Sequence, residues 1–286
     1  MEYTLKLTGR SGCEIGLVYH DGLPVVRKYS KSIAYNERLI RQAEKQQRFL
    51  QGPAAQIFSS PRVMALGKGS HESLAWLEME YVHAEKYSDF LERIGIPEIR
   101  SLAEAFRRYF SVMIDKAQKV NLPESVFLEK LQSLRTEIRP DSGFNDHLLH
   151  DVYTYLGNVP QGEILVGECH GDYTFSNMLF GDQQLFLIDF LDTFVESPVQ
   201  DIVKFRQDTR YHWSLMVEGE VPLYKRNKLV QVLTFLDQVG QEVIDRNPLV
   251  KTWYTYLQVF NLLRILPYLH EQHEIKFVES ALEQTI

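Results

Sequence analysis

The hydrophobic pattern of the 286-residue chain changes once, near residue 82. Before that point apolar and polar residues mostly alternate, as in strands with one buried face; after it apolar residues return at helical spacing. At about 150 residues per domain, the chain has the length of two domains or of one domain with two lobes. The pattern therefore predicts an α+β chain with a sheet-rich part over residues 1–82 and a larger, mainly helical part over residues 83–286.

The sheet-rich part is predicted to hold an antiparallel sheet and one helix. Asp21-Gly22 is a strong hairpin signal, because both residues tolerate the positive φ that a tight turn demands. The predicted strands are 3–7, 14–19, 24–28, 63–66 and 73–79, and the predicted amphipathic helix is 36–50.

The second part is predicted to be helical except for one strand-rich segment, 167–190, in which a polar loop precedes the apolar run 185–188. The predicted helices are 87–94, 98–119, 123–136 and 146–156, and helical periods resume from residue 198 to the end. Residues 253–269 are the most apolar long stretch. Gln258, Asn261 and Arg264 interrupt it, which predicts a packed helix and no membrane span.

Composition excludes several classes of protein. Hydrophobic residues at 44% and charged residues at 24% are ordinary for a folded domain. A net charge of −7 disfavours nucleic acid or an anionic membrane as the main partner. Cys13 and Cys169 form no CxxC pair, so neither a disulfide framework nor a cysteine zinc site is predicted. With no signal peptide in the first residues, we expect a cytoplasmic protein.

The most informative stretch reads HxDxxxxN from His170 to Asn177, and an Ile-Asp-Phe element places Asp189 twelve residues after Asn177. Phosphoryl transfer needs a carboxylate that orients the attacking hydroxyl and oxygen ligands for the magnesium that bridges the phosphates. Asp172, Asn177 and Asp189 would supply that set. Mg²⁺ prefers such hard oxygen donors and completes its shell with water and phosphate oxygens.

With these elements in this order, the chain resembles the aminoglycoside phosphotransferase and choline kinase-like enzymes, over roughly residues 5–208. The resemblance implies a bilobal protein kinase-like fold, with a small N-terminal antiparallel sheet lobe and a larger helical lobe. It also implies ATP and Mg²⁺ as cofactors. By the same resemblance Asp172 is the catalytic base, and Asn177 and Asp189 bind the metal.

Two upstream features, a loop and a lysine, fit the resemblance. The segment 8–14 joins the first two strands, and its small residues would let backbone N–H groups approach the nucleotide phosphates: Gly9, Ser11 and Gly12. Its spacing departs from the GxGxxG of protein kinases and looks more like the short loop of small-molecule kinases. Lys28, at the end of the third strand, is expected to reach the α and β phosphates.

Two further expectations concern the partner of Lys28 and the adenine ring. Glu44, sixteen residues after Lys28, is the favoured partner of the lysine, and Glu37 is the rival. The connector 77–82 resembles a kinase hinge, in which backbone groups of Glu80 and Val82 would contact adenine.

Other residues admit two interpretations each. His170 is expected to hold its loop rather than act as base or ligand. Asp201 is either an N-terminal helix cap or a substrate contact. Asp208, with other acidic residues, would attract a polyamine or simply line a solvated helix face. The C-terminal aromatic residues over 211–213 and 253–260 either bind an acceptor or form core.

We therefore predict an ATP-dependent enzyme that moves the γ-phosphoryl group onto a hydroxyl of a small molecule. Candidate acceptors are an aminoglycoside, choline or another amino alcohol, or a sugar or glycan precursor. The alternatives are a catalytically inactive nucleotide-binding regulatory module and a protein kinase. Only eleven residues separate Asp189 from Asp201, too few for a usual activation segment, which disfavours protein substrates. The sequence does not indicate an oligomeric state.

Overall fold

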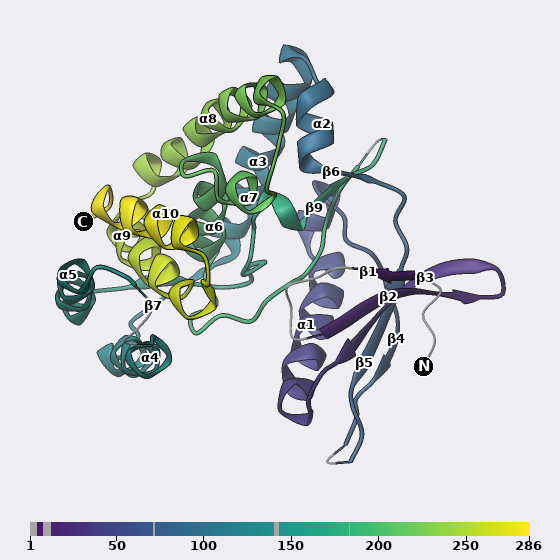
Figure 1. Ribbon diagram of the computed structural model, residues 1–286, viewed down its shortest axis with the longest axis horizontal. Helices are drawn as coiled ribbons and strands as arrows, with labels where there is room; N and C mark the ends of the chain where they lie inside the picture. Colours follow the sequence, from purple (N-terminus) through teal and green to yellow (C-terminus); the bar gives the residue numbers. More distant parts are fainter. Residues whose placement is uncertain (1–4, 8–12, 71, 140–142, 183) are drawn as a thin grey trace. The chain divides into compact units, whose positions relative to one another are not determined.

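The computed structural model describes residues 5–7, 13–70, 72–139, 143–182 and 184–286. The chain forms two compact units (Figure 1). Unit 1 comprises Met1–Phe90 and Ser176–Asp192, and unit 2 comprises Leu91–Phe175 and Thr193–Ile286. The boundary predicted at residue 82 refers to two functional parts of the chain, and it stays a prediction.

Unit 1 contains a five-stranded antiparallel sheet of order β1-β2-β3-β5-β4. Its strands are β1 (Leu5–Leu7), β2 (Cys13–His20), β3 (Leu23–Ser30), β4 (Val63–Gly67) and β5 (Trp76–Glu80). The hairpin predicted at Asp21-Gly22 joins β2 and β3, and both residues have positive φ, 50° and 81°. The predicted antiparallel sheet is therefore confirmed.

Helix α1 (Ile33–Gln51) packs on this sheet because one of its faces is apolar (Figure 1). Leu39 and Ala43 of that face are fully buried against Leu77 and Met79 of β5, in a core that also holds Cys13. Burial raises the pKa of the Cys13 thiol, although nearby Lys28 opposes the shift. A 3-10 turn, η1 (Pro53–Gln56), follows the helix.

Residues 176–192 join unit 1 through a second sheet of order β10-β9-β6. Its strands are β6 (Glu85–Lys86), β9 (Met178–Phe180) and β10 (Leu185–Leu187). Ser59 fastens β10: its N–H donates to the Leu185 carbonyl and its carbonyl accepts from the Leu187 N–H, both at 2.8 Å. The short strand predicted over 185–188 is present, whereas β6 had no signal in the sequence. Helix α2 (Tyr87–Arg93) follows β6.

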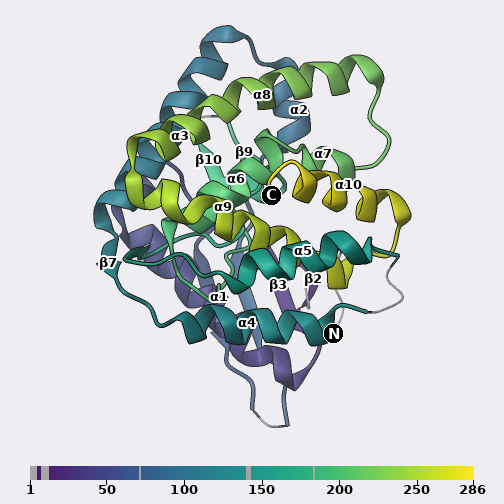
Figure 2. The ribbon, with the colours of Figure 1, turned by 90° about the vertical axis from the view of Figure 1, so that its left-hand side faces the viewer.

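Unit 2 is mainly helical (Figure 2). Its helices are α3 (Ile96–Lys116), α4 (Glu124–Glu137), α5 (Asp146–Gly157), α6 (Pro198–Thr209), α7 (Trp213–Val217), α8 (Leu223–Arg246), α9 (Pro248–Leu263) and α10 (Gln272–Glu283). The remaining elements are the strand pair β7 (Gln118–Val120) and β8 (Ile164–Val166), and the 3-10 turns η2 (Phe175–Asn177) and η3 (Leu266–Tyr268). Helix α6 packs against both α8 and α9.

Two predicted helices extend too far. The helix predicted over 98–119 ends at Lys116, because residues 118–120 leave it to pair with β8. The helix predicted over 253–269 ends at Leu263, and Pro267, which has no N–H to donate, lies in the following 3-10 turn. Within the described ranges, no helix is long and apolar enough to cross a bilayer. Trp253, Tyr256 and Phe260 are buried, so these C-terminal aromatic residues form core.

Candidate active site

Lys28 and Asp189 meet in unit 1 although 161 residues separate them in the sequence. Lys28 lies in β3, where it is paired with Ile15 of β2 and with Leu77 of β5. The two neighbouring strands therefore fix its backbone. Its side chain is buried, and Nζ donates a hydrogen bond to the Asp189 carboxylate. A buried ammonium requires such a partner, because its desolvation is otherwise unfavourable. The two predicted residues therefore form one charged pair.

The β9–β10 hairpin brings Asn177 next to Asp189. Its register pairs Leu187 with Met178, which places Asn177 opposite Ile188, and the Ile188 N–H donates to the Asn177 carbonyl at 3.0 Å. Asp189 has a φ of 60°, a left-handed conformation that is uncommon outside glycine. Backbone strain of this kind concentrates at functional sites.

The donor set of Asn177 and Asp189 suits a magnesium ion. An amide oxygen and a carboxylate are hard ligands, and Mg²⁺ is usually held by one or two carboxylates together with water and substrate phosphates. No group of three or more His, Cys, Asp or Glu side chains that could hold a metal occurs among the described residues. With Asn177 and Asp189 as its protein ligands, a magnesium ion would complete its coordination shell with water and with oxygens of a bound nucleotide.

The predicted pairing of Lys28 with a carboxylate of α1 is wrong for this structure. Lys28 pairs with Asp189, and neither Glu44 nor Glu37, both described, contacts it. Glu44 is half-buried on α1, while Glu37 is exposed and pairs with Arg41 at 3.5 Å. The sequence spacing could not show that Asp189 supplies the carboxylate.

Basic residues of α1 hold the segment that follows Asp189. Arg38 Nε and Arg41 Nη2 lie 3.6 Å and 3.3 Å from the Asp192 carboxylate. Lys45 is buried and donates from Nζ to the Leu191 carbonyl at 2.5 Å. Sequence analysis missed this set. A sequence signal for it was the spacing of three and four residues between the cations, which places them on one side of the helix.

The remaining nucleotide-binding predictions fall on the N-terminal loop and the connector. Three residues lie outside the described ranges: Gly9, Ser11 and Gly12. Glu80 ends β5, its N–H donates to the Arg62 carbonyl at 2.9 Å, and its carboxylate pairs with the Arg62 side chain at 3.1 Å. Val82 lies in residues 81–84, which have no regular secondary structure and lead into β6. Their contacts with adenine stay predictions.

In unit 2, Asp201 of α6 holds the start of the loop 170–175. Its carboxylate accepts hydrogen bonds from the backbone N–H groups of His170 and Gly171, at 2.7 and 2.8 Å, and from the Tyr109 hydroxyl at 2.7 Å. Gly171 has a φ of 85°, a conformation that favours glycine. The helix-cap interpretation of Asp201 is wrong, because Ser197 caps α6 by accepting from the Val199 N–H.

Asp208, two turns further along α6, holds the other end of that loop. Its carboxylate accepts from the Phe175 N–H at 2.6 Å, and from the N–H and hydroxyl of Ser214 in α7 at 2.7 and 2.8 Å. Asp208 is fully buried, which raises its pKa to about 6 although these donors favour the charged form. The interpretation of Asp208 as part of a solvated acidic face is therefore wrong.

Asp172 lies between these two anchors. Its side chain is one-quarter exposed, and its Oδ1 lies 3.1 Å from Lys204 Nζ of α6. The Asp172 N–H donates to His170 Nδ1 at 3.2 Å, so that nitrogen carries no proton and the ring braces the loop. A partly accessible carboxylate on a fixed loop is suited to orient a hydroxyl group and accept its proton.

Aromatic side chains of α3 pack against the loop 170–175. Tyr173, directly after Asp172, is fully buried and stacks on Tyr109 of α3, with ring centroids 4.5 Å apart and planes 9° apart. Phe106 and Phe110 of α3 meet the Tyr173 ring edge-on. Sequence analysis missed these contacts. The sequence feature that could have indicated these contacts is the spacing of two residues between Tyr173 and Phe175, which allows both rings to lie on the same side of the loop.

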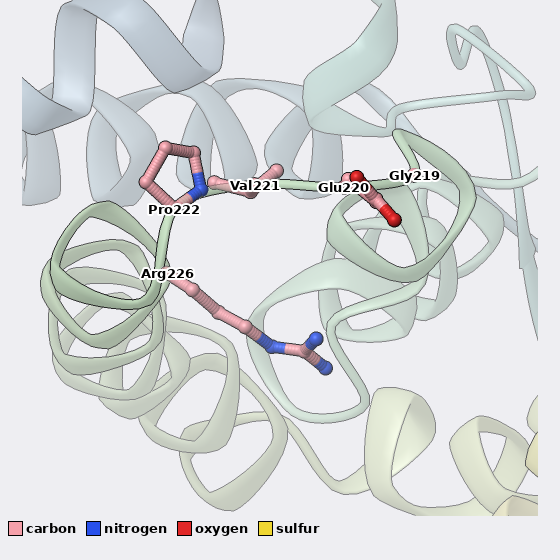
Figure 3. A pocket seen from close by; sticks show the side chains of 5 residues that line it. All are labelled: Gly219, Glu220, Val221, Pro222 and Arg226. Atoms are coloured by element: carbon pink, nitrogen blue, oxygen red, sulfur yellow. The ribbon is translucent and has the colours of Figure 1, made fainter.

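A pocket of ≈ 500 Å³ lies elsewhere in unit 2, where the loop after α7 enters α8 (Figure 3). Its lining consists of Gly219, Glu220, Val221, Pro222 and Arg226. None of the predicted site residues lines it.

Residues 17–219 match the model of the phosphotransferase enzyme family, which is more than half of the chain. The chain therefore belongs to the phosphotransferase enzyme family. No curated protein sequence matches it.

Solved structures of similar fold include several aminoglycoside phosphotransferases. A thermostable mutant of APH(4)-Ia in its apo form matches with a TM-score of 0.60 at 10% identity, over 98% of this chain and 92% of that one. APH(2")-IIa in complex with gentamicin gives 0.56 at 15% identity, over 99% and 91%. ADP-bound APH(2'')-Ib gives 0.53 at 14% identity, over 98% and 92%. At these identities the likeness shows the protein kinase-like fold, as predicted.

Proposed function

We propose that this protein transfers the γ-phosphoryl group of ATP to a hydroxyl group of a small molecule. The observation that carries the proposal is the pair formed by Lys28 and Asp189. The family resemblance implies that both residues serve one nucleotide, Lys28 at its phosphates and Asp189 at its metal, and the two side chains form a pair although they come from distant parts of the sequence. If this buried lysine served folding alone, any nearby carboxylate could be its partner, and the partner need not be the aspartate of the Ile-Asp-Phe element.

In the proposed reaction unit 1 supplies the groups for the nucleotide. Lys28 neutralises charge on the α and β phosphates, where a fixed cation costs no reorganisation during the reaction. Asn177 and Asp189 would hold Mg²⁺, which supplies further charge compensation when bound with the nucleotide. Glu80 and Val82 remain the proposed adenine contacts.

Unit 2 supplies the group for the acceptor. Asp172 accepts a hydrogen bond from the acceptor hydroxyl and aligns its oxygen with the γ-phosphorus. As the bond between that oxygen and phosphorus forms, the bond from phosphorus to the ADP oxygen breaks, ADP leaves, and Asp172 takes the hydroxyl proton. Because the transition state of phosphoryl transfer is loose, alignment matters more than proton abstraction. Asp201 and Asp208 keep the Asp172 backbone from moving, which supports such alignment.

Support for a small-molecule acceptor comes from family membership and from what proteins of this fold bind. A complex of APH(2")-IIa holds streptomycin and ATP, and this chain covers 90% of that protein with a TM-score of 0.51. We extend the class of reaction to this chain, with an aminoglycoside, an amino alcohol or a sugar derivative as the acceptor.

The proposal is tested by an acceptor screen that measures ADP release with Mg-ATP and the full chain. The panel contains kanamycin, choline, homoserine and a set of hexoses. Asp172→Asn serves as the blank, because it preserves size and removes the carboxylate. We expect at least one acceptor to stimulate ADP release, and Asp172→Asn to lower kcat about 100-fold or more.

A binding measurement separates the two roles of the site. Asp172→Asn should bind Mg-ADP with an affinity within about threefold of the wild type, whereas Lys28→Met should bind it at least about tenfold more weakly. If the wild type bound Mg-ADP but released no ADP with any acceptor, the inactive nucleotide-binding module would replace the enzyme. Absence of nucleotide binding would reject both.

A further inference from the structure

Helix α6 has one residue whose environment differs from that of all the others. Its other residues are buried, whereas Lys204 is half-buried, with its side chain 13% exposed. Asp201, Lys204 and Asp208 follow one another at intervals of three and four residues, which places them along one face of the helix. All three contact the loop 170–175. This face therefore does more than pack in the core.

The three charged residues of this face have different kinds of partner. Asp201 and Asp208 each accept three hydrogen bonds from N–H and O–H groups. Lys204, between them in the sequence, instead pairs with the side chain of Asp172 at 3.1 Å. A cation at this degree of burial is destabilising unless a carboxylate compensates its desolvation. The only member of the loop that presents a carboxylate to it is Asp172.

We propose that Lys204 is a positioning residue for phosphoryl transfer, which holds the Asp172 carboxylate ionised and in a fixed orientation. The proposal rests on the proposed function of Asp172 and names a residue outside the HxDxxxxN and Ile-Asp-Phe elements. The ammonium restricts the rotamers of Asp172 and so fixes the direction in which its carboxylate would face an acceptor hydroxyl.

The ionisation state of Asp172 depends on the groups around it. Lys204 favours the carboxylate, while Asp208 lies close enough for like-charge repulsion. Asp201 faces the backbone of the preceding residues, and His170 accepts from the Asp172 N–H with an unprotonated nitrogen. Lys204 lies within ion-pair distance of the Asp172 side chain. Its loss would remove this compensating charge while the Asp208 carboxylate stays nearby.

The test measures Asp172 directly and needs no acceptor. The carboxyl carbon of Asp172 is observed by NMR in protein labelled with [4-¹³C]aspartate, and its signal is assigned by its disappearance in Asp172→Asn. Its titration is followed from pH 3 to 8 in the wild type and in Lys204→Met, which keeps the length of the side chain and removes the charge. Lys204→Arg, which keeps the charge, tests rescue.

A matched control is available in the same unit. Lys225 of α8 pairs with Glu92 at 3.0 Å, and its side chain is 12% exposed, almost the same as that of Lys204. Lys225→Met therefore removes a comparable ion pair that does not involve the loop 170–175. Circular dichroism of all the variants shows whether each is folded.

We expect the midpoint of the Asp172 titration to lie at a higher pH in Lys204→Met, and at its wild-type value in Lys204→Arg and Lys225→Met. With any acceptor found in the screen, Lys204→Met should lower kcat about 10- to 100-fold and leave both KM values within about threefold. An unchanged midpoint in folded Lys204→Met would overturn the proposal. A wild type with no ATP turnover would instead overturn the proposed function, while the titration would still report on the pair.

Discussion

The hydroxyl of Tyr109 donates a 2.7 Å hydrogen bond to the carboxylate of Asp201, and neither residue is exposed to solvent. The contact ties α3 to α6 at the point where Asp201 also holds two N–H groups of the loop 170–175. Burial and the neighbouring Asp201 charge raise the pKa of Tyr109 well above its usual value, so the phenol stays a donor. One carboxylate thus links two helices and the loop that carries Asp172.

Substitutions of Tyr109 and of Asp201 should lower the free energy of unfolding by different amounts. Tyr109→Phe removes one of three donors to the Asp201 carboxylate and should lower the free energy of unfolding by about 1–2 kcal/mol. Asp201→Asn turns an amide N–H toward a backbone N–H and should cost about 3 kcal/mol or more. Urea unfolding measures both. Tyr155→Phe, on half-buried Tyr155 of α5, is the control and should change little. Equal losses in all three variants would contradict the assignment.

The pH dependence of stability should report on Asp208. Its pKa is raised by burial from an ordinary 3.8 to about 6, so the folded protein binds this proton more tightly than the unfolded chain. Stability from this group is therefore fully present below about pH 4 and is lost as the pH rises through 6. A shift of about two units corresponds to roughly 3 kcal/mol.

The variant Asp208→Asn lacks this titration. The difference in unfolding free energy between wild type and Asp208→Asn, measured by urea at pH 4.5 and pH 7.5, should be larger at pH 4.5. Asp237→Asn provides a comparison at another carboxylate of unit 2, which is paired with Arg206 at 2.8 Å. An equal difference at both pH values would mean that Asp208 does not titrate in this range, and a difference that grows toward pH 7.5 would mean that folding lowers its pKa instead of raising it.

The metal requirement should separate Asp189 from Lys28. Asp189→Asn removes the charge of the proposed metal ligand and should raise the Mg²⁺ concentration for half-maximal ADP release at least about tenfold. Lys28→Met should lower kcat but shift the Mg²⁺ requirement much less, because its proposed contact is with the phosphates. EDTA should abolish turnover in the wild type, and added Mg²⁺ should restore it. If Lys28→Met shifted the Mg²⁺ requirement as much as Asp189→Asn, the separate roles would be wrong.

Local spacing explains which parts of this site could be predicted from sequence. The antiparallel sheet, the hairpin at Asp21-Gly22 and the strand before Asp189 depend on neighbouring residues, and the alternation of apolar residues shows them directly. Lys28 could be predicted because its place at the end of a strand is also a local property. The end of α3 could not, because residues 118–120 are drawn into a strand by a partner more than forty residues away.

Charged residues on helices were the main source of error. Asp201, Lys204 and Asp208 have the composition of a solvated face, and only the contacts with a loop some thirty residues earlier show that the face is covered. The same applies to Glu44, whose proximity in sequence to Lys28 was outweighed by Asp189. A charge pattern along a helix gives its face but not what packs on that face, and this limits prediction from sequence alone.

A last prediction concerns Lys45, through which α1 contacts the segment after Asp189. Its ammonium is buried and donates to the Leu191 carbonyl, so Lys45→Met leaves that carbonyl without this donor and should destabilise the protein by about 1–3 kcal/mol. Arg62→Ala is the control, because Arg62 is highly exposed and its pair with Glu80 contributes little.

Because Leu191 lies two residues after Asp189, the substitution should also disturb the position of Asp189, the proposed metal ligand. Lys45→Met should lower kcat about tenfold at saturating Mg-ATP, and Asp192→Asn, which weakens the contacts of Arg38 and Arg41, should lower it less. Thermal unfolding and ADP release measure the two effects on the same samples. If Lys45→Met behaved like Arg62→Ala in both, α1 would not hold the segment in place, and the position of Asp189 would depend on its contact with Lys28 and on the β9–β10 hairpin.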